Sequence, residues 1–230
     1  MALLQEREKE IFETLKKIKG VHFVVIGGYA VNAYTLPRFS VDCDIVLQER
    51  TEGEKISLQL EAQGYVKEKN SSQQPPYHGK FLRYVKKLGA SFQVSMDILM
   101  EEIIDRQSGA LFPAAWVLQH SQVRELPGKT IPEKLKIRII DVDALVVMKW
   151  VSCRNTDVRD VFMLLPKVKD NSWVREEIAH FTDYSARFTK IKEKITSKEF
   201  KNNLQGVFGY VDEQTFEKHV KAVLRMKEEQ

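Results

Sequence analysis

The sequence predicts a mixed α/β (α+β) fold, in which a sheet with flanking helices is followed by a C-terminal helical bundle. In the first part of the chain, short apolar runs rich in β-branched residues alternate with stretches of helical periodicity. From Val142 onward almost every segment has helical periodicity. We therefore predict a sheet-based domain over residues 1–140 and a helical domain over residues 141–230.

The first part begins with an amphipathic helix over residues 3–19, which Gly20 ends. The run VHFVVI, residues 21–26, is a short buried strand because it is apolar and rich in β-branched residues. A turn-rich loop is predicted over residues 70–79. The other predicted elements are a helix over 29–36, a strand over 41–47, a helix over 54–64, and strands over 65–69, 80–87 and 91–100.

The second part is almost wholly helical. Residues 113–140 predict a short helix followed by irregular or strand structure, because Pro127, Gly128 and Pro132 interrupt any longer periodicity. The helices predicted after this segment cover residues 142–152, 156–166, 172–181, 183–195 and 213–228.

The composition is that of a globular chain. Its 230 residues, 43% hydrophobic and 30% charged, are enough to bury a core without disulfides or metals. No apolar run approaches the ~18 residues that cross a bilayer, and the N-terminal residues lack the apolar stretch of a secretory leader. The two cysteines, Cys43 and Cys153, are too few for a disulfide framework or a zinc site. We therefore expect a cytoplasmic protein with no membrane partner.

Charge is distributed unevenly around a net value of +4. Residues 64–90 and 121–169 have an excess of Lys and Arg, whereas residues 91–120 between them have an excess of Asp and Glu. Such an arrangement suits a polyanionic substrate beside a metal site, although on charge alone solvated strand edges and helix faces are the favoured explanation. Basic residues that alternate imperfectly on one predicted strand offer a track for a nucleic-acid backbone: Lys80, Arg83, Lys86 and Lys87.

Two aspartates alternate along the strand predicted over residues 41–47. Because successive side chains of a strand point to opposite faces, Asp42 and Asp44 lie on the same side. Their mutual repulsion favours a cation between them, and Mg²⁺ prefers carboxylate and phosphate oxygens as ligands. The alternative is an exposed strand face with two solvated aspartates.

Two glycines precede this pair. The strand over residues 21–26 ends in Gly27-Gly28 and passes directly into a helical stretch. Glycine allows the backbone to approach a ligand closely, and a helix N-terminus offers N–H groups to a phosphate. A glycine pair alone is also explained by a tight turn. It is more specific when followed by the series Arg38-x-Ser40-x-Asp42-x-Asp44.

This arrangement resembles the nucleotidyltransferase superfamily with the DNA polymerase β-like fold, and is most similar to the minimal nucleotidyltransferases and the AbiEii-type abortive-infection toxins. The residues that carry the resemblance are Gly27, Gly28, Ala30, Arg38, Ser40, Asp42 and Asp44. It implies a nucleotidyltransferase-like mixed sheet, with Gly27, Gly28, Arg38 and Ser40 at the nucleotide. Tyr29 follows the glycines where many relatives have a serine, so a serine contact to the triphosphate is not carried over.

The superfamily often supplies a third carboxylate from a later strand. Asp97 lies on the polar face of the strand over residues 91–100 and is the natural candidate. The resemblance therefore implies a metal site of Asp42, Asp44 and Asp97 that holds two Mg²⁺ ions, with Mn²⁺ as the alternative ion. Asp97 is also the candidate general base for the acceptor hydroxyl. The alternative for Asp97 is a surface position at the end of a strand.

A second block, residues 141–164, resembles a helix with a lysine, a basic turn and an Asp-x-x-Asp helix in AbiEii-like proteins. Lys149, Arg154, Asp157 and Asp160 occupy those places. The resemblance implies that Lys149 is catalytic and neutralises charge on the leaving pyrophosphate, and that Arg154 and Asp160 belong to the nucleotide site. Alternatively, Lys149 lies on a solvated edge, Arg154 forms a surface ion pair, or Asp160 orients Lys149 or Arg154.

The implied activity is metal-dependent transfer of a nucleoside monophosphate from an NTP to an acceptor hydroxyl. The resemblance to AbiEii-type toxins favours RNA, especially tRNA 3′ ends, as the acceptor, and an antitoxin protein as a partner. Two alternatives stay open at this point: transfer to a small molecule such as an aminoglycoside, and a non-catalytic module that binds nucleotides or another protein.

Overall fold

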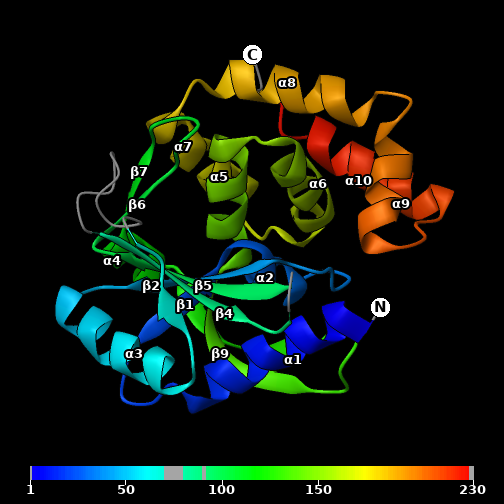
Figure 1. Cartoon of the computed structure of the whole chain (residues 1–230). Coiled ribbons are helices and arrows are strands. Elements are labelled where there is room, and N and C mark those ends of the chain that lie inside the picture. The colour runs from blue at the N-terminus through cyan, green and yellow to red at the C-terminus, as the bar shows by residue number, and fades with distance from the viewer. Residues whose placement is uncertain (1, 70–79, 90–91, 228–230) are drawn as a thin grey trace. The chain divides into compact units, whose positions relative to one another are not determined.

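A mixed β-sheet and a group of helices form two units of the chain (Figure 1). The structure is a computed structural model that describes residues 2–69, 80–89 and 92–227. The first unit comprises Met1–Ala33, Pro37–Ile104 and Leu111–Ile140, and the second comprises Tyr34–Leu36, Asp105–Ala110 and Asp141–Gln230. The loop predicted over residues 70–79 lies outside the described residues.

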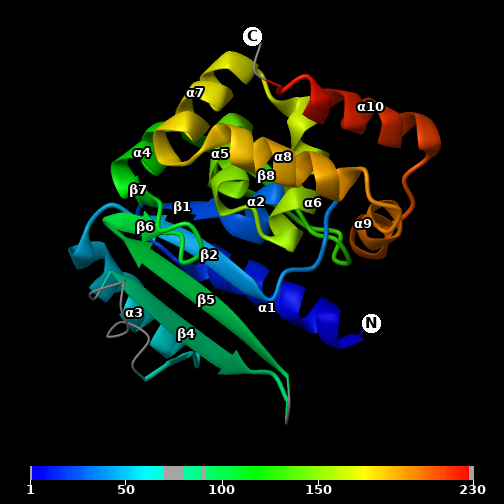
Figure 2. The same ribbon diagram turned by 90° about the horizontal axis from the view of Figure 1, so that it is seen from above.

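Among the described residues, the first unit has a seven-stranded sheet in the order β3-β4-β5-β2-β1-β9-β8. Its strands are β1 (Phe23–Ile26), β2 (Asp42–Leu47), β3 (Val66–Lys67), β4 (Phe81–Lys87), β5 (Gln93–Met100), β8 (Ser121–Pro127) and β9 (Lys134–Ile140). β2 runs parallel to β5, and β1 runs parallel to β9, whereas the other neighbours are antiparallel. Figure 2 shows β4, β5 and β2 side by side.

Helices cover the two faces of this sheet. The helices of the unit are α1 (Ala2–Lys17), α2 (Gly27–Asn32), α3 (Arg50–Ala62) and α4 (Ala114–Gln119). Figure 1 shows α1 and α3 on one face and α2 on the other. Cys43 and Ile45 of β2 pair in register with Met96 and Ile98 of β5, and all four are fully buried in the core of the unit. A short hairpin, β6 (Glu102–Ile104) and β7 (Leu111–Pro113), follows β5.

The second unit is helical. Its elements are α5 (Val142–Ser152), α6 (Asn155–Leu164), η1 (Leu165–Lys167), α7 (Asn171–Phe181), α8 (Tyr184–Ile195), α9 (Phe200–Phe208) and α10 (Glu213–Leu224). α5 packs against α6 and α7, and α6 packs against α8 and α10. Aromatic rings fill the core: Trp150 stacks on Tyr184 with centroids 5.7 Å apart, and Phe162 meets Phe200 edge to face at 5.1 Å.

The predicted fold class is confirmed, although some elements differ from the prediction. α2 begins at Gly27, two residues earlier than expected, because Gly27 adopts φ +65° and the chain turns there directly out of β1. The predicted helix extended to residue 36, but residues 34–36 belong to the second unit. The sequence prediction missed β6, β7 and α9. The described residues contain no helix that is both long and apolar enough to cross a membrane.

Candidate functional site

The three aspartates predicted as metal ligands lie on neighbouring strands of the first unit. β2 and β5 run parallel, with Asp44 in register with Asp97 and Asp42 in register with Ser95. Paired residues on adjacent strands point to the same face, so the three carboxylates share one face of the sheet. Cys43 points to the opposite face, where burial, followed by the charges of the three aspartates, raises the pKa of its thiol well above the usual value.

Arg83 holds the carboxylate of Asp97. It lies opposite Asp97 on β4, and its Nε and Nη2 donate to Oδ1 and Oδ2 at 2.8 Å and 2.5 Å. The same Nη2 lies 3.9 Å from Asp42 Oδ2. Burial raises the pKa of Asp97 by more than the contact with Arg83 lowers it, so its carboxyl group is a stronger base than an ordinary aspartate.

The chemistry of the donor set fits a hard divalent cation, but the three carboxylates do not form a ready site. Asp42 Oδ1 accepts a short hydrogen bond from Ser95 Oγ, and its side chain is 39% exposed. Both oxygens of Asp97 accept from Arg83. Within the described ranges, no group of three His, Cys, Asp or Glu side chains is placed to hold a metal ion. The aspartates of β2 therefore fit Mg²⁺ as ligands, whereas Asp97 fits only if Arg83 releases it.

Gly27 is packed directly against the Asp44 carboxylate. A Cβ built on Gly27 would overlap Asp44 Oδ2, and the φ of +65° at this position disfavours any other residue. Ile26, the last residue of β1, pairs with Asp44 across the antiparallel strands. The turn from β1 into α2 therefore needs glycine both for its backbone conformation and for the room that Asp44 occupies.

Gly28 makes the corresponding contact with the segment before β2. A Cβ on Gly28 would overlap Ser40 Oγ and would lie 3.3 Å from Arg38 Nη1. Asn32, which is 1% exposed, holds this segment: its Nδ2 donates to Arg38 O and its Oδ1 accepts from Arg38 N, both at 2.9 Å. The structure thus brings Arg38 and Ser40 to the glycines, and it adds Asn32, which no sequence motif had indicated.

The basic run on β4 is largely paired with carboxylates of the same unit. Lys80 Nζ lies 2.5 Å from Glu102 Oε2, and Lys86 Nζ lies 2.8 Å from Glu10 Oε1. Arg83 is bound to Asp97, as described above. Three of the four cations of this run thus lie beside carboxylates, whereas Lys87 is exposed, and the track for a nucleic-acid backbone stays a prediction.

Lys149, in the second unit, lies between two aspartates of α6. Its Nζ is 2.8 Å from Asp157 Oδ1 and 3.0 Å from Asp160 Oδ2. The three side chains are 14%, 4% and 1% exposed, respectively. Lys149 is therefore neither a solvated edge residue nor an isolated cation. The contact with Asp160 agrees with the alternative in which Asp160 orients Lys149.

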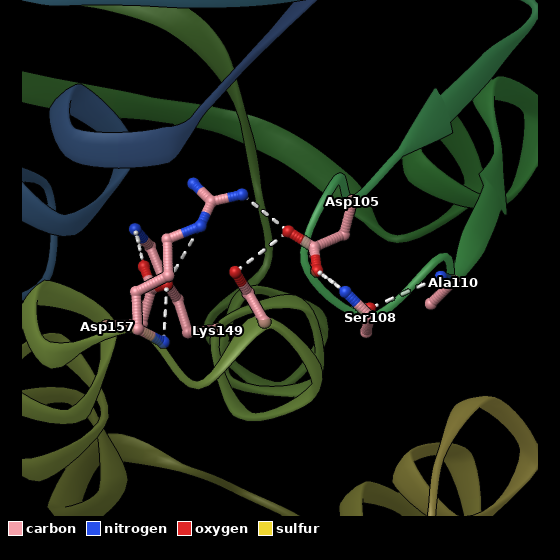
Figure 3. A network of polar contacts seen from close by, with 7 residues as sticks. Asp105, Ser108, Ala110, Lys149 and Asp157 are labelled. Carbon is pink, nitrogen blue, oxygen red and sulfur yellow. Dashed lines mark hydrogen bonds and ion pairs between the residues drawn. The ribbon is translucent and has the colours of Figure 1, made fainter. Parts of the chain in front are cut away.

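Arg154 is the N-cap residue of α6 and contacts a carboxylate that no sequence motif had indicated. Its Nη2 lies 2.5 Å from Asp105 Oδ1, while its backbone N donates to Asp157 Oδ2 at 3.2 Å. Figure 3 shows the two aspartates, Asp105 and Asp157. Asp105 follows β6 and is 8% exposed. Asp105, Arg154, Asp157 and Lys149 thus form one chain of polar contacts within the second unit.

Comparison of the sequence with known protein families and with curated proteins gives no match. Comparison with solved structures does give matches, among them a nucleotidyltransferase. The sheet order, the glycine turn and the paired aspartates described above are thus found on a chain with the nucleotidyltransferase fold, which confirms the fold that the resemblance had implied.

The similar structures include a toxin and an antibiotic-resistance factor. MenT4, a nucleotidyltransferase toxin from Mycobacterium tuberculosis, matches with a TM-score of 0.56 and 12% identity over 98% of this chain and 82% of that chain. The antibiotic-resistance factor ANT(2″)-Ia matches with a TM-score of 0.51 and 11% identity over 82% and 96%. Its complex with adenylyl-2″-tobramycin gives 0.50 and 12% over 80% and 99%.

Proposed function

We propose that this protein is a metal-dependent nucleotidyltransferase that moves a nucleoside monophosphate from an NTP to an acceptor hydroxyl. One observation carries the proposal: Asp42 and Asp44 share a face of β2, and the Gly27 turn packs on Asp44 so closely that no side chain fits between them. A surface pair of solvated aspartates has no need of such a turn. The nucleotidyltransferase fold supports the same activity.

Asp42 and Asp44 are the proposed ligands of Mg²⁺ or Mn²⁺, and Asp97 is the proposed third carboxylate. When bound, two such ions would stabilise the charge on the attacking and leaving oxygens of a displacement at the α-phosphorus. Asp97, whose pKa is raised by burial, would accept the proton of the acceptor hydroxyl. Because Arg83 binds both oxygens of Asp97, it has to turn away before Asp97 can do so.

The phosphates of the nucleotide are proposed to contact groups that carry hydrogen-bond donors. The backbone at Gly27 and Gly28 is open to close approach, and Arg38 and Ser40 lie beside it. In the second unit, Arg154 is the more accessible cation, at 51% exposed against 14% for Lys149. Among the cations of the second unit taken by itself, we therefore propose Arg154 first for phosphate contact, with Lys149 held in place by Asp157 and Asp160.

Two classes of acceptor follow from different observations. Likeness to the toxin MenT4 supports a toxin-type enzyme, for which we propose RNA, especially tRNA, as the acceptor and an antitoxin protein as a partner. Likeness to ANT(2″)-Ia bound to adenylyl-2″-tobramycin supports a small-molecule acceptor of the aminoglycoside type. We place RNA first because the TM-score to MenT4 is higher and that match covers 98% of this chain.

The test is transfer of label from each α-labelled NTP in Mg²⁺ or Mn²⁺, with total RNA in one arm and a panel of aminoglycosides in the other. Asp44→Asn keeps the size of the side chain but removes its charge, and it should abolish incorporation. Glu125→Gln, at an exposed ion pair on β8, is the matched control and should keep wild-type incorporation. Equal incorporation by wild type and Asp44→Asn would contradict the assignment of the site.

The same samples distinguish the enzyme from a non-catalytic module. Binding of Mg²⁺·NTP by calorimetry, without transfer to any RNA or aminoglycoside, would support the module and overturn the enzymatic proposal. If labelled RNA forms, retention of the protein on an RNA column should fall steeply as the salt concentration rises, because phosphate contacts release counterions. Turnover that depends on an aminoglycoside and is insensitive to salt would favour the small-molecule acceptor over RNA.

A further inference from the structure

We propose that Asp105 is a positioning residue for Arg154: it fixes the guanidinium so that its exposed side is presented to the phosphates of a nucleotide. This inference rests on the proposed function for the identity of the ligand, but the contacts that carry it lie wholly within the second unit. Asp105 was not among the residues that the sequence had indicated, and the proposed chemistry does not use it.

The carboxylate of Asp105 is bound on both oxygens. Oδ1 accepts from Arg154 Nη2 at 2.5 Å and from Ser152 Oγ at 2.9 Å. Oδ2 accepts from the backbone N of Ser108 at 2.8 Å and from its Oγ at 2.7 Å. Figure 3 shows Asp105 with Ser108 on its own loop on one side and the polar contacts of the helical elements on the other.

The loop that carries Asp105 is closed on itself. Asp105 N donates to Ala110 O at 2.9 Å, and Gly109 N donates to Asp105 O at 2.8 Å. Gly109 adopts φ +76°, which a side chain would disfavour. The carboxylate is therefore held by a short, internally bonded turn. Its position does not depend on the guanidinium alone.

The surroundings of the Asp105 carboxyl group favour its ionised form. Burial, the largest single influence, raises the pKa of its carboxyl group, but the hydrogen bonds from Ser108 and Ser152 and the charge of Arg154 together lower it below the usual value. A carboxylate that is 8% exposed and ionised is a strong anchor for a guanidinium. Arg154, by contrast, is 51% exposed, so one part of it is anchored while much of it stays accessible.

Asp157 extends the same arrangement to Lys149. Its Oδ2 accepts from Arg154 N and its Oδ1 accepts from Lys149 Nζ, so one buried carboxylate fixes the backbone of one cation and the ammonium of the other. Asp157 Oδ2 also lies 4.0 Å from Arg154 Nε, and Asp105 fixes the end of the same side chain at Nη2. A long arginine side chain loses rotamer entropy when it is ordered, and here that loss occurs before a ligand binds.

The first experiment measures order in Arg154 without any ligand. The Nε–Hε signal of Arg154 in a ¹⁵N correlation spectrum is assigned by its loss in Arg154→Lys. We expect a resolved signal in wild type that moves to the position of a solvent-averaged arginine in Asp105→Asn. An unchanged signal in Asp105→Asn would overturn the proposal, since Arg154 would then be positioned without Asp105.

The second experiment measures binding of inorganic tripolyphosphate with Mg²⁺ by calorimetry. Asp105→Asn should weaken binding roughly tenfold, Arg154→Ala at least as much, and the double variant no more than Arg154→Ala alone, because Asp105 acts only through Arg154. Asp143→Asn is the matched control, because Asp143 is another carboxylate of the second unit and accepts from two backbone N–H groups. The affinity of this variant for tripolyphosphate should not change.

Three outcomes would overturn the proposal: wild-type affinity in Asp105→Asn, a further tenfold loss when Asp105→Asn is added to Arg154→Ala, or no binding of tripolyphosphate by wild type. Failure of the proposed function would give a different set of results. In that case no label would be transferred to RNA or aminoglycosides, while the effects of Asp105→Asn and Arg154→Ala on tripolyphosphate would persist.

Discussion

Replacing Arg83 by Gln should destabilise the first unit more than replacing Asp97 by Asn, although both changes remove the same ion pair. The side chain of Asp97 is 7% exposed and that of Arg83 is 34% exposed. Arg83→Gln leaves a buried carboxylate without its cation, whereas Asp97→Asn leaves a guanidinium that water can reach. Removing one partner of a buried pair costs about 3–5 kcal/mol, and because Arg83 is partly exposed we expect about 3 kcal/mol for Arg83→Gln.

Asp97→Asn should cost less. The asparagine keeps one carbonyl oxygen that accepts from Arg83, so only part of the pair is lost, and a hydrogen bond to a charged group is worth about 1.5–3 kcal/mol. Because the remaining guanidinium is one-third solvated, we expect about 1 kcal/mol for this variant. The double variant should be more stable than Arg83→Gln, since it removes the unpaired buried charge.

The destabilisation caused by Arg83→Gln should depend on pH. Burial raises the pKa of Asp97 in the wild type, so the native state binds this proton more tightly than the unfolded chain. The contribution of such a group to stability is present at low pH and is lost as the pH rises through its native pKa. Without Arg83 the native pKa rises further, so the destabilisation by Arg83→Gln should be smaller at about pH 4 than at about pH 8.

Urea unfolding followed by circular dichroism measures these free energies. Lys134→Gln, which breaks the exposed pair with Glu125, is the control and should change stability by less than about 1 kcal/mol. Equal costs for Arg83→Gln and Asp97→Asn, or a cost of Arg83→Gln that does not change between the two pH values, would refute the argument that Arg83 compensates a buried charge.

Three further predictions concern other parts of the chain. Gly27→Ala should lose nucleotide binding in calorimetry and at least about 1 kcal/mol of stability, because a Cβ overlaps Asp44 and φ is +65°. Glu8→Gln should cost about 2 kcal/mol in urea unfolding, because Glu8 is 3% exposed and Oε2 accepts from Thr130 N and Oγ1 at 2.7 Å and 2.6 Å. Burial lowers the pKa of His219, so the unfolded chain binds the proton more readily and stability should fall as the pH drops below about 6.5. His219→Gln should reduce that loss in a pH series of melting temperatures, and an undiminished loss would contradict it.

The part of the site that could be predicted depends on residues close together in the sequence. Alternation along β2 places Asp42 and Asp44 on one face, and the turn at Gly27 and Gly28 follows from the end of an apolar strand. These are local properties, set by backbone geometry over a few residues. The face of Asp97 was predictable in the same way, from the alternation of β5.

The partners of these residues were not predictable, because each depends on which strands or helices become neighbours. Arg83 meets Asp97 only through the register of β4 with β5. Asp105 and Arg154 are 49 residues apart and come together through the packing of a loop on the second unit. α9 did leave a signal, since Phe200, Leu204 and Phe208 recur every fourth residue and are buried, but polar residues between them obscured it.

The charge of the proposed metal site in the first unit limits how two ions would bind there. Asp42, Asp44 and Asp97 carry three negative charges when ionised, and Arg83 compensates one of them, so at most two negative charges remain, which one divalent cation can balance. A second divalent cation would give the site a positive excess that only an anionic ligand offsets. A triphosphate has that charge. The proposal of two ions is therefore consistent with this site if the second ion enters together with the NTP, and Arg83 then sets the charge that the first ion meets.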